Sequence, residues 1–376
     1  MKYKRLCFKT LLKYCTINLS EEINHLFFIL KQLSDKLTSI IIVNHNTGNL
    51  LLECVESIYK TEKFHFEIII VDNVSTDNSH ILCKERFPEI KLIENSNNVG
   101  YCEGNNIGIK EASGYFVVIL NPDTRVEPFW LIELIKEYDK YGDALYQPKI
   151  LTLKNPTIIN TAGNMIHPFG FSFSRGQGDI DKGQFNEHQE IGSASGACLF
   201  TTINILKSIN MLDPFLFVYH DDTDLNWKAA HLGIKSYYVP SSIIYHLGGY
   251  YYKWSQRKFF LLERNRHYLL LTHYSRKTFY KMLPALIFVD LMVLLYYLSK
   301  GMFKIKLKAY LDIIKNRKYI KNIYNELENK KLICDKEIIK KWPDEIFIPH
   351  GIGGTVLNRI FNVMILFLCK STRRFL

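Results

Sequence analysis

The sequence predicts an α/β fold with a mostly parallel β-sheet, helices on both faces of the sheet, and a helical extension at the C-terminal end. Short apolar runs rich in β-branched residues alternate with helical patterns four times between residues 38 and 120. Each run ends in a polar loop, and this order is typical of right-handed βαβ units. Beyond residue 275 the apolar stretches have helical length and stand among lysines. We therefore expect an N-terminal extension over 1–37, an α/β domain over 38–275 and a helical, basic region over 276–376.

The N-terminal extension is basic and then apolar, with its strongest hydrophobic stretch at 26–30. Lys13 interrupts the apolar run and no small-residue cleavage site follows, so the pattern is not that of a secretory signal peptide. We expect an additional helix here, either lying on a membrane or packed on the domain.

The first predicted strand, 39–43, is a continuous apolar run, as expected of a parallel strand buried on both faces. A helical pattern follows from Leu51 to Ile58. The second strand runs directly into Asp72, and a Ser/Thr/Asp/Asn cluster behind it offers N-cap residues to the next helix. The third strand is predicted at 90–93, the next helix at 103–112 and the fourth strand at 115–120.

Polar residues gather where three of these strands end, at 44–46, 72–77 and 121–123. In open α/β sheets, ligands bind outside the carboxyl ends of the strands. The topology alone therefore predicts that these three groups share one cleft.

The helical region contains an apolar stretch at 282–298, broken by Pro284 and Asp290. About 17 residues is the lower edge for a membrane-spanning helix, and a charge near its middle makes spanning costly. We therefore favour a helix that lies in the membrane plane or packs on the domain. Lysine-rich sequence over 300–341 and a second apolar stretch at 363–369 suit contact with an anionic membrane. An ordinary solvated basic face is the alternative.

The composition excludes a disordered chain, because 47% of the 376 residues are hydrophobic and 14% are aromatic. A formal net charge of +11 favours an anionic partner. The 8 cysteines form no CxxC pair, which excludes a zinc knuckle or a thioredoxin-type site and fits a reducing compartment.

Six ordered segments resemble the family 2 glycosyltransferases of the GT-A fold, especially the rhamnosyltransferase-like branch. The resemblance covers about residues 38–275, and six motifs in the same order are more specific than any one alone. The segments are 39–48 (SIIIVNHNTG), 68–79 (IIIVDNVSTDNS), 95–123 (ENSNNVG to NPD), 192–199 (GSASGACL), 219–225 (YHDDTDL) and 239–249 (VPSSIIYHLGG).

The resemblance implies a Rossmann-like GT-A sheet and an inverting, metal-dependent transfer of a sugar from a nucleotide-diphosphate sugar to a hydroxyl group. The implied acceptor is a glycan or lipid-linked glycan in cell-surface polysaccharide assembly, at the cytoplasmic, inner face of the cell membrane. Nucleic acid is not an expected partner.

Asp123 ends a buried strand, and hard divalent cations prefer carboxylate oxygens. The resemblance makes Asp123 the metal-binding aspartate of the family's D-x-D motif, with Asn121 at the first position of that motif. It also makes His246 a metal ligand, and Mn²⁺ or Mg²⁺ the expected ion. The alternatives are a simple turn at Asn121-Pro122-Asp123 and a structural histidine.

The acidic run Asp221-Asp222-Thr223-Asp224 is framed by apolar and aromatic sequence, which favours a half-buried position over a solvated face. Crowded carboxylates in a dry cleft raise one another's pKa, which suits a general base working near neutrality. The resemblance makes Asp222 that base, with Asp221 in place of the family's glutamate. Asp224 is expected to anchor the loop or cap the following helix.

Donor-binding candidates lie at the strand ends and in the helix after residue 255. Arg264 is a candidate contact of the diphosphate, and a structural ion pair is its alternative. Helix capping is the alternative for the residues around Asp72. Small residues at Gly196 and Ala197 suit the acceptor side. The nucleotide-sugar candidates are Asn44, Asn46, Asp72, Asn73, Asn98, Gly100, Asn105, Asn121 and Arg264.

Two other classes of protein share an α/β fold of this kind. A sugar-nucleotide pyrophosphorylase requires a G-x-G-x-R-type phosphate loop after the first strand, where this chain reads NHNTG, and is set aside. A catalytically silent, membrane-associated assembly partner with the same fold is the remaining alternative.

Overall fold

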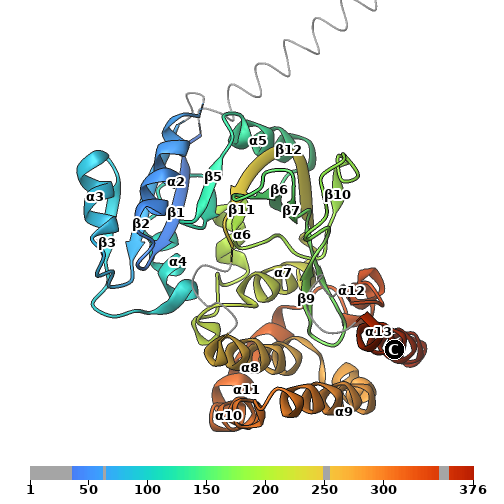
Figure 1. The fold of residues 1–376 in the computed structure, drawn as a ribbon. Coiled ribbons are helices and arrows are strands. Elements are labelled where there is room, and N and C mark those ends of the chain that lie inside the picture. The colour runs from blue at the N-terminus through green and yellow to red at the C-terminus, as the bar shows by residue number, and fades with distance from the viewer. Residues whose placement is uncertain (1–35, 62–64, 249–254, 347–354) are drawn as a thin grey trace, which may run out of the picture.

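The computed structural model describes residues 36–61, 65–248, 255–346 and 355–376 (Figure 1). The helix predicted at the N-terminal end lies outside the described residues.

The first half of the sheet is parallel, as predicted. Strands β1 (Thr38–Asn44), β2 (Phe66–Asp72), β3 (Lys91–Glu94) and β4 (Phe116–Leu120) lie in the order β3-β2-β1-β4. The intervening helices are α2 (Asn49–Tyr59), α3 (Ser79–Arg86) and α4 (Gly100–Lys110). These bounds agree with the sequence prediction to within a few residues.

The second half of the sheet is mixed. Strand β11 (Cys198–Thr202) runs antiparallel to both β4 and β6 (Leu145–Thr152), and β12 (Ser236–His246) runs parallel to β6. The fourth predicted strand is not followed directly by a helix. The short strand β5 (Thr124–Val126) comes next in the chain and pairs with β12. This pairing brings the end of β12 beside the end of β4. The remaining elements here are α5 (Trp130–Tyr141), β7 (Ile159–Thr161), β8 (Asn164–Ile166), β9 (Ser172–Ser174), β10 (Gln189–Glu190), α6 (Ile203–Ser208), the 3₁₀ turn η1 (Pro214–Leu216) and α7 (Asp221–His231).

The core lies on both faces of the sheet. Ile40 and Ile42 of β1 point into one buried cluster, which α2 and α5 cover, whereas Ile41 points into the other. This alternation explains why β1 reads as a continuous apolar run.

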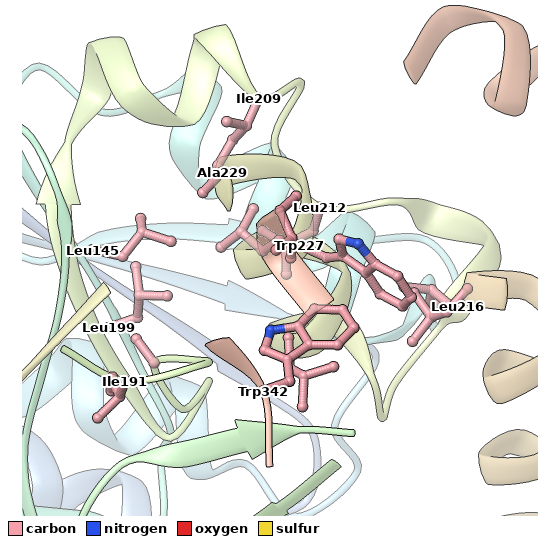
Figure 2. Packing of buried hydrophobic residues seen from close by; sticks show 14 of the residues in the cluster. Leu145, Ile191, Leu199, Ile209, Leu212, Leu216, Trp227, Ala229 and Trp342 are labelled. Carbon is pink, nitrogen blue, oxygen red and sulfur yellow. The ribbon is translucent and has the colours of Figure 1, made fainter. Parts of the chain in front are cut away.

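The C-terminal helices belong to the second of these clusters and have no separate core among the described residues. Figure 2 shows Trp342, which follows α12, close to Trp227 of α7, and their ring centroids are 4.8 Å apart at an edge-on angle of 84°. The helices are α8 (Gln256–His273), α9 (Arg276–Ser299), α10 (Phe303–Lys315), α11 (Arg317–Lys330), α12 (Asp335–Lys341) and α13 (Thr355–Phe375). Among the described helices, α9 alone is long and apolar enough to cross a bilayer by length and composition.

Candidate active site

A cavity of about 390 Å³ opens at the carboxyl ends of the parallel strands. Its walls come from the ends of β1, β2, β4 and β12, the start of α4, the loop before β11 and the start of α7. Most of the residues singled out in the sequence line it: Asn73, Asn98, Gly100, Asn121, Asp123, Gly196, Ala197, Asp221, Asp222 and His246.

One wall of the cavity carries Asp123 and His246. Oδ1 of Asp123 lies 3.2 Å from Nε2 of His246, and Nδ2 of Asn121 lies 3.2 Å from the same nitrogen. The carboxylate is fixed from behind, because the backbone N–H of Gly248 donates to its Oδ2 over 3.2 Å. Pairing between β5 and β12 produces this arrangement, since Thr124 lies opposite His246 in the ladder.

This group fits a divalent cation. Nδ1 of His246 lies 3.4 Å from Oδ1 of Asn160, and a partner on one ring nitrogen orients the other toward an ion. Burial works to raise the pKa of Asp123, but His246 and the Gly248 N–H outweigh burial and hold the pKa below its usual range. Asp123 is therefore an anion at neutral pH, as a metal ligand must be.

A second acidic group with metal-like spacing lies elsewhere, at Glu263, His267 and Asp290. Its carboxylates already hold two buried cations. Arg266 Nη2 lies 2.6 Å from Glu263 and 2.8 Å from Asp290, and Lys306 contacts both carboxylates. The charges are thus balanced without an ion, and the group joins α8, α9 and α10.

The opposite wall carries the first turn of α7. The Thr223 backbone N–H donates to Oδ1 of Asp222 over 2.7 Å, and Nδ2 of Asn164 donates to Oδ2 over 3.1 Å. Asp222 is half-buried and lines the cavity beside the buried Asp221.

Burial dominates the acid–base behaviour of this pair. Burial, with the charge of Asp222 second, raises the pKa of Asp221 to about 7. Burial also raises the pKa of Asp222, against the hydrogen bonds from Thr223 and Asn164. The pair therefore holds a proton-accepting group close to neutrality, which is what a general base requires.

Asp224, only two residues away, is held differently. It is fully buried, with Oδ1 2.9 Å from Nε2 of His273 and Oδ2 2.5 Å from Nζ of Lys228. Burial alone would raise the pKa of Asp224, but Lys228 and His273 outweigh it and lower the pKa. Asp224 thus joins α7 to α8, in keeping with the anchoring role expected from the sequence.

The loop that enters α7 is strained. Phe217, Tyr219 and His220 have φ angles of 65°, 69° and 59°, in the left-handed region that side chains usually avoid. The buried Asn265 holds this loop: its Nδ2 lies within 3.0 Å of three loop carbonyl oxygens, those of residues 216, 218 and 219. Such strain persists only where the surroundings enforce it.

Arg264 takes part in the same clamp. Its Nη2 donates to the carbonyl oxygens of Phe215 and Leu216 over 2.6 and 2.9 Å, and Asp312 lies 3.6 Å from its Nη1. Arg264 is not among the cavity-lining residues, and its donors are engaged with the loop. Its predicted contact with a diphosphate stays a prediction, and the structural alternative now has named partners.

Four other donor candidates also lie outside the cavity lining. Asn44 donates to Asp72 over 2.8 Å, and Oδ2 of Asp72 accepts from the backbone of Ser75. Asn46 accepts from the backbone of Thr76, so these three side chains tie the loops after β1 and β2 together. Asn105 is buried inside α4. Their predicted contacts with the donor remain untested.

Gly196, which was predicted to lie on the acceptor side, leaves room for the acidic pair. A Cβ on Gly196 would lie 3.1 Å from Oδ2 of Asp221 and 3.4 Å from the hydroxyl of Tyr101. Tyr101 donates to the Gly196 carbonyl oxygen over 2.6 Å. A larger residue at this position would therefore crowd the carboxylate.

Sequence reasoning missed several lining residues, among them His45, Tyr101, Asn164 and Lys258. His45 and Tyr101 stand inside segments that were recognised as motifs, so their position was a usable signal. Asn164 lies on the short strand β8, and no local pattern marked it. Asn265 stands in a polar Glu-Arg-Asn-Arg segment between two apolar runs of α8, which was a signal for buried polar partners.

Comparisons with known proteins show what this chain is similar to. Residues 39–197 match the family model described as glycosyl transferase family 2. A low-salt glycan biosynthesis hexosyltransferase, Agl10 of Haloferax volcanii, is 26% identical over 52% of this chain and 62% of its own length. The chain thus spans less than two thirds of that relative.

An N-acetylglucosaminyl-diphospho-decaprenol L-rhamnosyltransferase of Mycobacterium tuberculosis is 21% identical over 55% of this chain and 75% of the relative. Among solved structures, GalNAc-T7 with UDP, GalNAc and Mn²⁺ superposes with a TM-score of 0.53 at 17% identity, over 67% of this chain and 51% of that chain. At that identity the likeness concerns the fold. Residues 39–197 are therefore similar to the family 2 glycosyltransferases, and the chain has the GT-A fold.

Proposed function

We propose that this protein is an inverting, metal-dependent glycosyltransferase that moves a sugar from a nucleotide-diphosphate sugar to a hydroxyl group of a glycan or lipid-linked glycan. The observation that carries the proposal is the pairing of two different acidic groups on one cavity. The anionic Asp123 with His246 lines one wall, and the proton-accepting Asp221–Asp222 pair lines the other.

In this mechanism a carboxylate oxygen of Asp222 accepts the proton of the acceptor hydroxyl. The hydroxyl oxygen then attacks the anomeric carbon from the face opposite the diphosphate, which leaves with the electrons of the broken C–O bond. The configuration inverts and no covalent enzyme intermediate forms. Asp123 and His246 would hold a Mn²⁺ or Mg²⁺ ion, whose charge stabilises the leaving diphosphate when it is bound.

The relatives support a particular class of donor and of acceptor for the proposed reaction. One is a hexosyltransferase, one a rhamnosyltransferase acting on a diphosphate-linked lipid, and the structural neighbour was solved with UDP and Mn²⁺. They support a hexose or deoxyhexose donor, with thymidine-diphosphate rhamnose as one candidate. They also support a lipid-linked acceptor at the cytoplasmic face of the membrane, in cell-surface polysaccharide assembly.

A catalytically silent assembly partner is the alternative function. The retained Asp123, Asp222 and His246 argue against it, because a protein that only binds has no need for a buried acidic pair with raised pKa values.

A donor screen tests the proposal. The full-length protein is melted with UDP-, dTDP- and GDP-sugars, with and without MnCl₂, and donor hydrolysis is then measured for any sugar that binds. We expect one nucleotide class to raise Tm only when the metal is present, since a ligand at about 100 times its Kd adds about 2.7 kcal/mol of stability. Metal-dependent binding without hydrolysis or transfer would favour the silent partner, and no binding of any donor would contradict the proposed enzyme.

A further inference from the structure

Three C-terminal helices present apolar side chains to solvent on the same part of the molecule. Helix α9 contacts both α10 and α13, and Figure 1 shows α9 and α10 along the lower edge with α13 near the end of α9. Among the described residues, more than half of the exposed large hydrophobic side chains lie on these three helices. An apolar patch of this extent marks an interaction site.

Helix α9 has two faces of different function. Its inner face packs into the core through Met282, Leu286 and Val289. Its outer face has no charged residue from 282 to 298, and its exposed positions recur every three or four residues. Leu291 is 53% and Leu295 is 63% exposed. The exposed side chains of this stripe are Tyr280, Ile287, Phe288, Leu291, Leu295 and Leu298.

The single acidic residue within α9 fixes the helix against the domain. Oδ1 of Asp290 lies 2.8 Å from Nη2 of the buried Arg266 and 2.6 Å from Nζ of the buried Lys306. Crossing a bilayer would separate these charges inside a medium where unpaired charge is costly. The geometry therefore suits a helix that lies in the plane of a membrane, with its apolar stripe turned outward.

Helix α10 repeats the pattern and adds charge. Phe303, Leu307, Leu311 and Ile314 are exposed at a helical spacing, and three exposed lysines form the adjacent stripe on the same helix: Lys304, Lys308 and Lys315. An apolar stripe flanked by lysines is the pattern of a helix at the boundary between lipid headgroups and acyl chains.

Helix α13 continues the surface. Its exposed Val363 and Phe367 are followed on the same side by Lys370 and Arg374. Nζ of Lys281 in α9 donates to the carbonyl oxygen of Phe375 over 2.7 Å, so the end of α13 is held beside the N-terminal part of α9.

We propose that the exposed stripes of α9, α10 and α13, here called the apolar face, bind in the plane of an anionic membrane. Apolar burial and attraction between lysines and anionic headgroups act together on this face. A second copy of the chain is a poorer occupant, because it would bring two lysine-rich borders together.

The apolar face also lies close to the cavity. Lys258 and Leu262 of α8 line the cavity, and Phe260 between them lies under Lys308 of α10, with 5.0 Å from Nζ to the ring centroid. A membrane-bound protein would thus hold its cavity near the headgroups, where a lipid-linked acceptor presents its sugar. This last step rests on the proposed function, whereas membrane binding itself does not.

Vesicle co-sedimentation of the full-length protein tests the proposal. Wild type should bind vesicles of phosphatidylglycerol and phosphatidylethanolamine more tightly than vesicles of phosphatidylcholine alone. The double variant Leu291→Ser/Leu295→Ser should lose at least about tenfold in binding, since each leucine contributes buried apolar area. The matched control is Ile81→Ser/Leu82→Ser, which removes two similarly exposed side chains from α3 and should leave binding unchanged.

A second variant tests the charge and guards against misfolding. Lys304→Gln/Lys315→Gln should weaken binding to the anionic vesicles by about fivefold per lysine and leave binding to neutral vesicles unchanged. Circular dichroism and Tm should match wild type in both variants. Equal binding of wild type and both variants would overturn the proposal. The proposal would also be overturned if wild type did not bind vesicles but formed a concentration-dependent dimer in light scattering, and if the leucine variant did not form that dimer. Neither assay contains a sugar donor, so a negative result leaves the proposed function standing.

Discussion

The carboxylates on the two walls of the cavity have pKa values shifted in opposite directions. At Asp123, His246 and the backbone N–H of Gly248 outweigh burial and hold the pKa below its usual range. At Asp221 and Asp222, burial raises both pKa values, and the cavity-facing side of the pair has no cation among its described hydrogen-bond and ion-pair partners. Asp123 and Asp221 are similarly buried, at 6% and 7% exposure, so burial alone does not explain the difference. The neighbours of each carboxylate decide whether it stays an anion or accepts a proton.

Asp224 sharpens this comparison because it belongs to the same helical turn as Asp222. Lys228 and His273 hold it as an anion in a fully buried position. One short acidic run thus contains a proton acceptor and a structural anion side by side. The comparison predicts that substitutions two residues apart have different consequences.

The largest expected effect is that of Asp222→Asn on turnover. Because the amide cannot accept the acceptor's proton, kcat should fall by about 10²–10⁴-fold while donor affinity stays nearly unchanged. Steady-state kinetics and donor calorimetry measure the two quantities separately. Asp139→Asn on α5, away from the cavity, is the matched control and should behave as wild type. A loss of donor affinity in Asp222→Asn as large as the loss of kcat would contradict the assignment of Asp222 as the base.

Asp224→Ala should act on stability instead. The substitution leaves Lys228 and His273 buried without their partner, and breaking such a pair costs about 3–5 kcal/mol. Urea unfolding followed by circular dichroism measures the loss, with Asp222→Asn as the comparison that should cost far less. If both substitutions cost the same, Asp224 is not the structural anchor of α7.

The fold of residues 38–120 could be predicted closely because its signals are local. Each parallel strand is buried on both faces and reads as an apolar run, and each helix carries its own periodicity. The second half of the sheet could not be ordered in this way, since β5 and β12 pair across more than a hundred residues. That pairing also sets the distance between Asp123 and His246, which the sequence suggested only by resemblance.

The site was predicted where side chains sit at strand ends, and less well where polar groups support a loop. Arg264 illustrates the difference: an arginine near a nucleotide site suggests a phosphate contact, but its hydrogen bonds go to the loop at 215–216. The residues at 217, 219 and 220 have left-handed conformations but are not glycines, so the sequence does not indicate these conformations. Support of strained backbone depends on three-dimensional contacts, which no local pattern contains.

A smaller effect is expected on the wall that carries Asp123 and His246. Asp123→Ala removes the proposed metal ligand, so metal-dependent donor affinity should fall by at least the roughly 10–100-fold typical of a supporting residue. Calorimetry with Mn²⁺ measures it, and EDTA should weaken donor binding by wild type in the same way. Unchanged binding in the variant would place the cation elsewhere.

The smallest effect is the pH dependence of turnover. It reports on the Asp221–Asp222 pair and not on Asp123, whose pKa lies below its usual range. A base must be ionised to act, and Asp222 shares its titration with Asp221, so activity should fall as the pH drops below the pKa of about 7 that the pair shows at Asp221. At pH 6 only about one tenth of such a group is ionised, which sets the expected fall in kcat at about tenfold. Because neighbouring carboxylates titrate as a pair, Asp221→Asn should remove the step near neutrality and move the acid limb to lower pH. His220 is not the source of this limb, since burial lowers its pKa to about 4. A limb that stays near pH 7 in Asp221→Asn would show that Asp221 does not carry the titration.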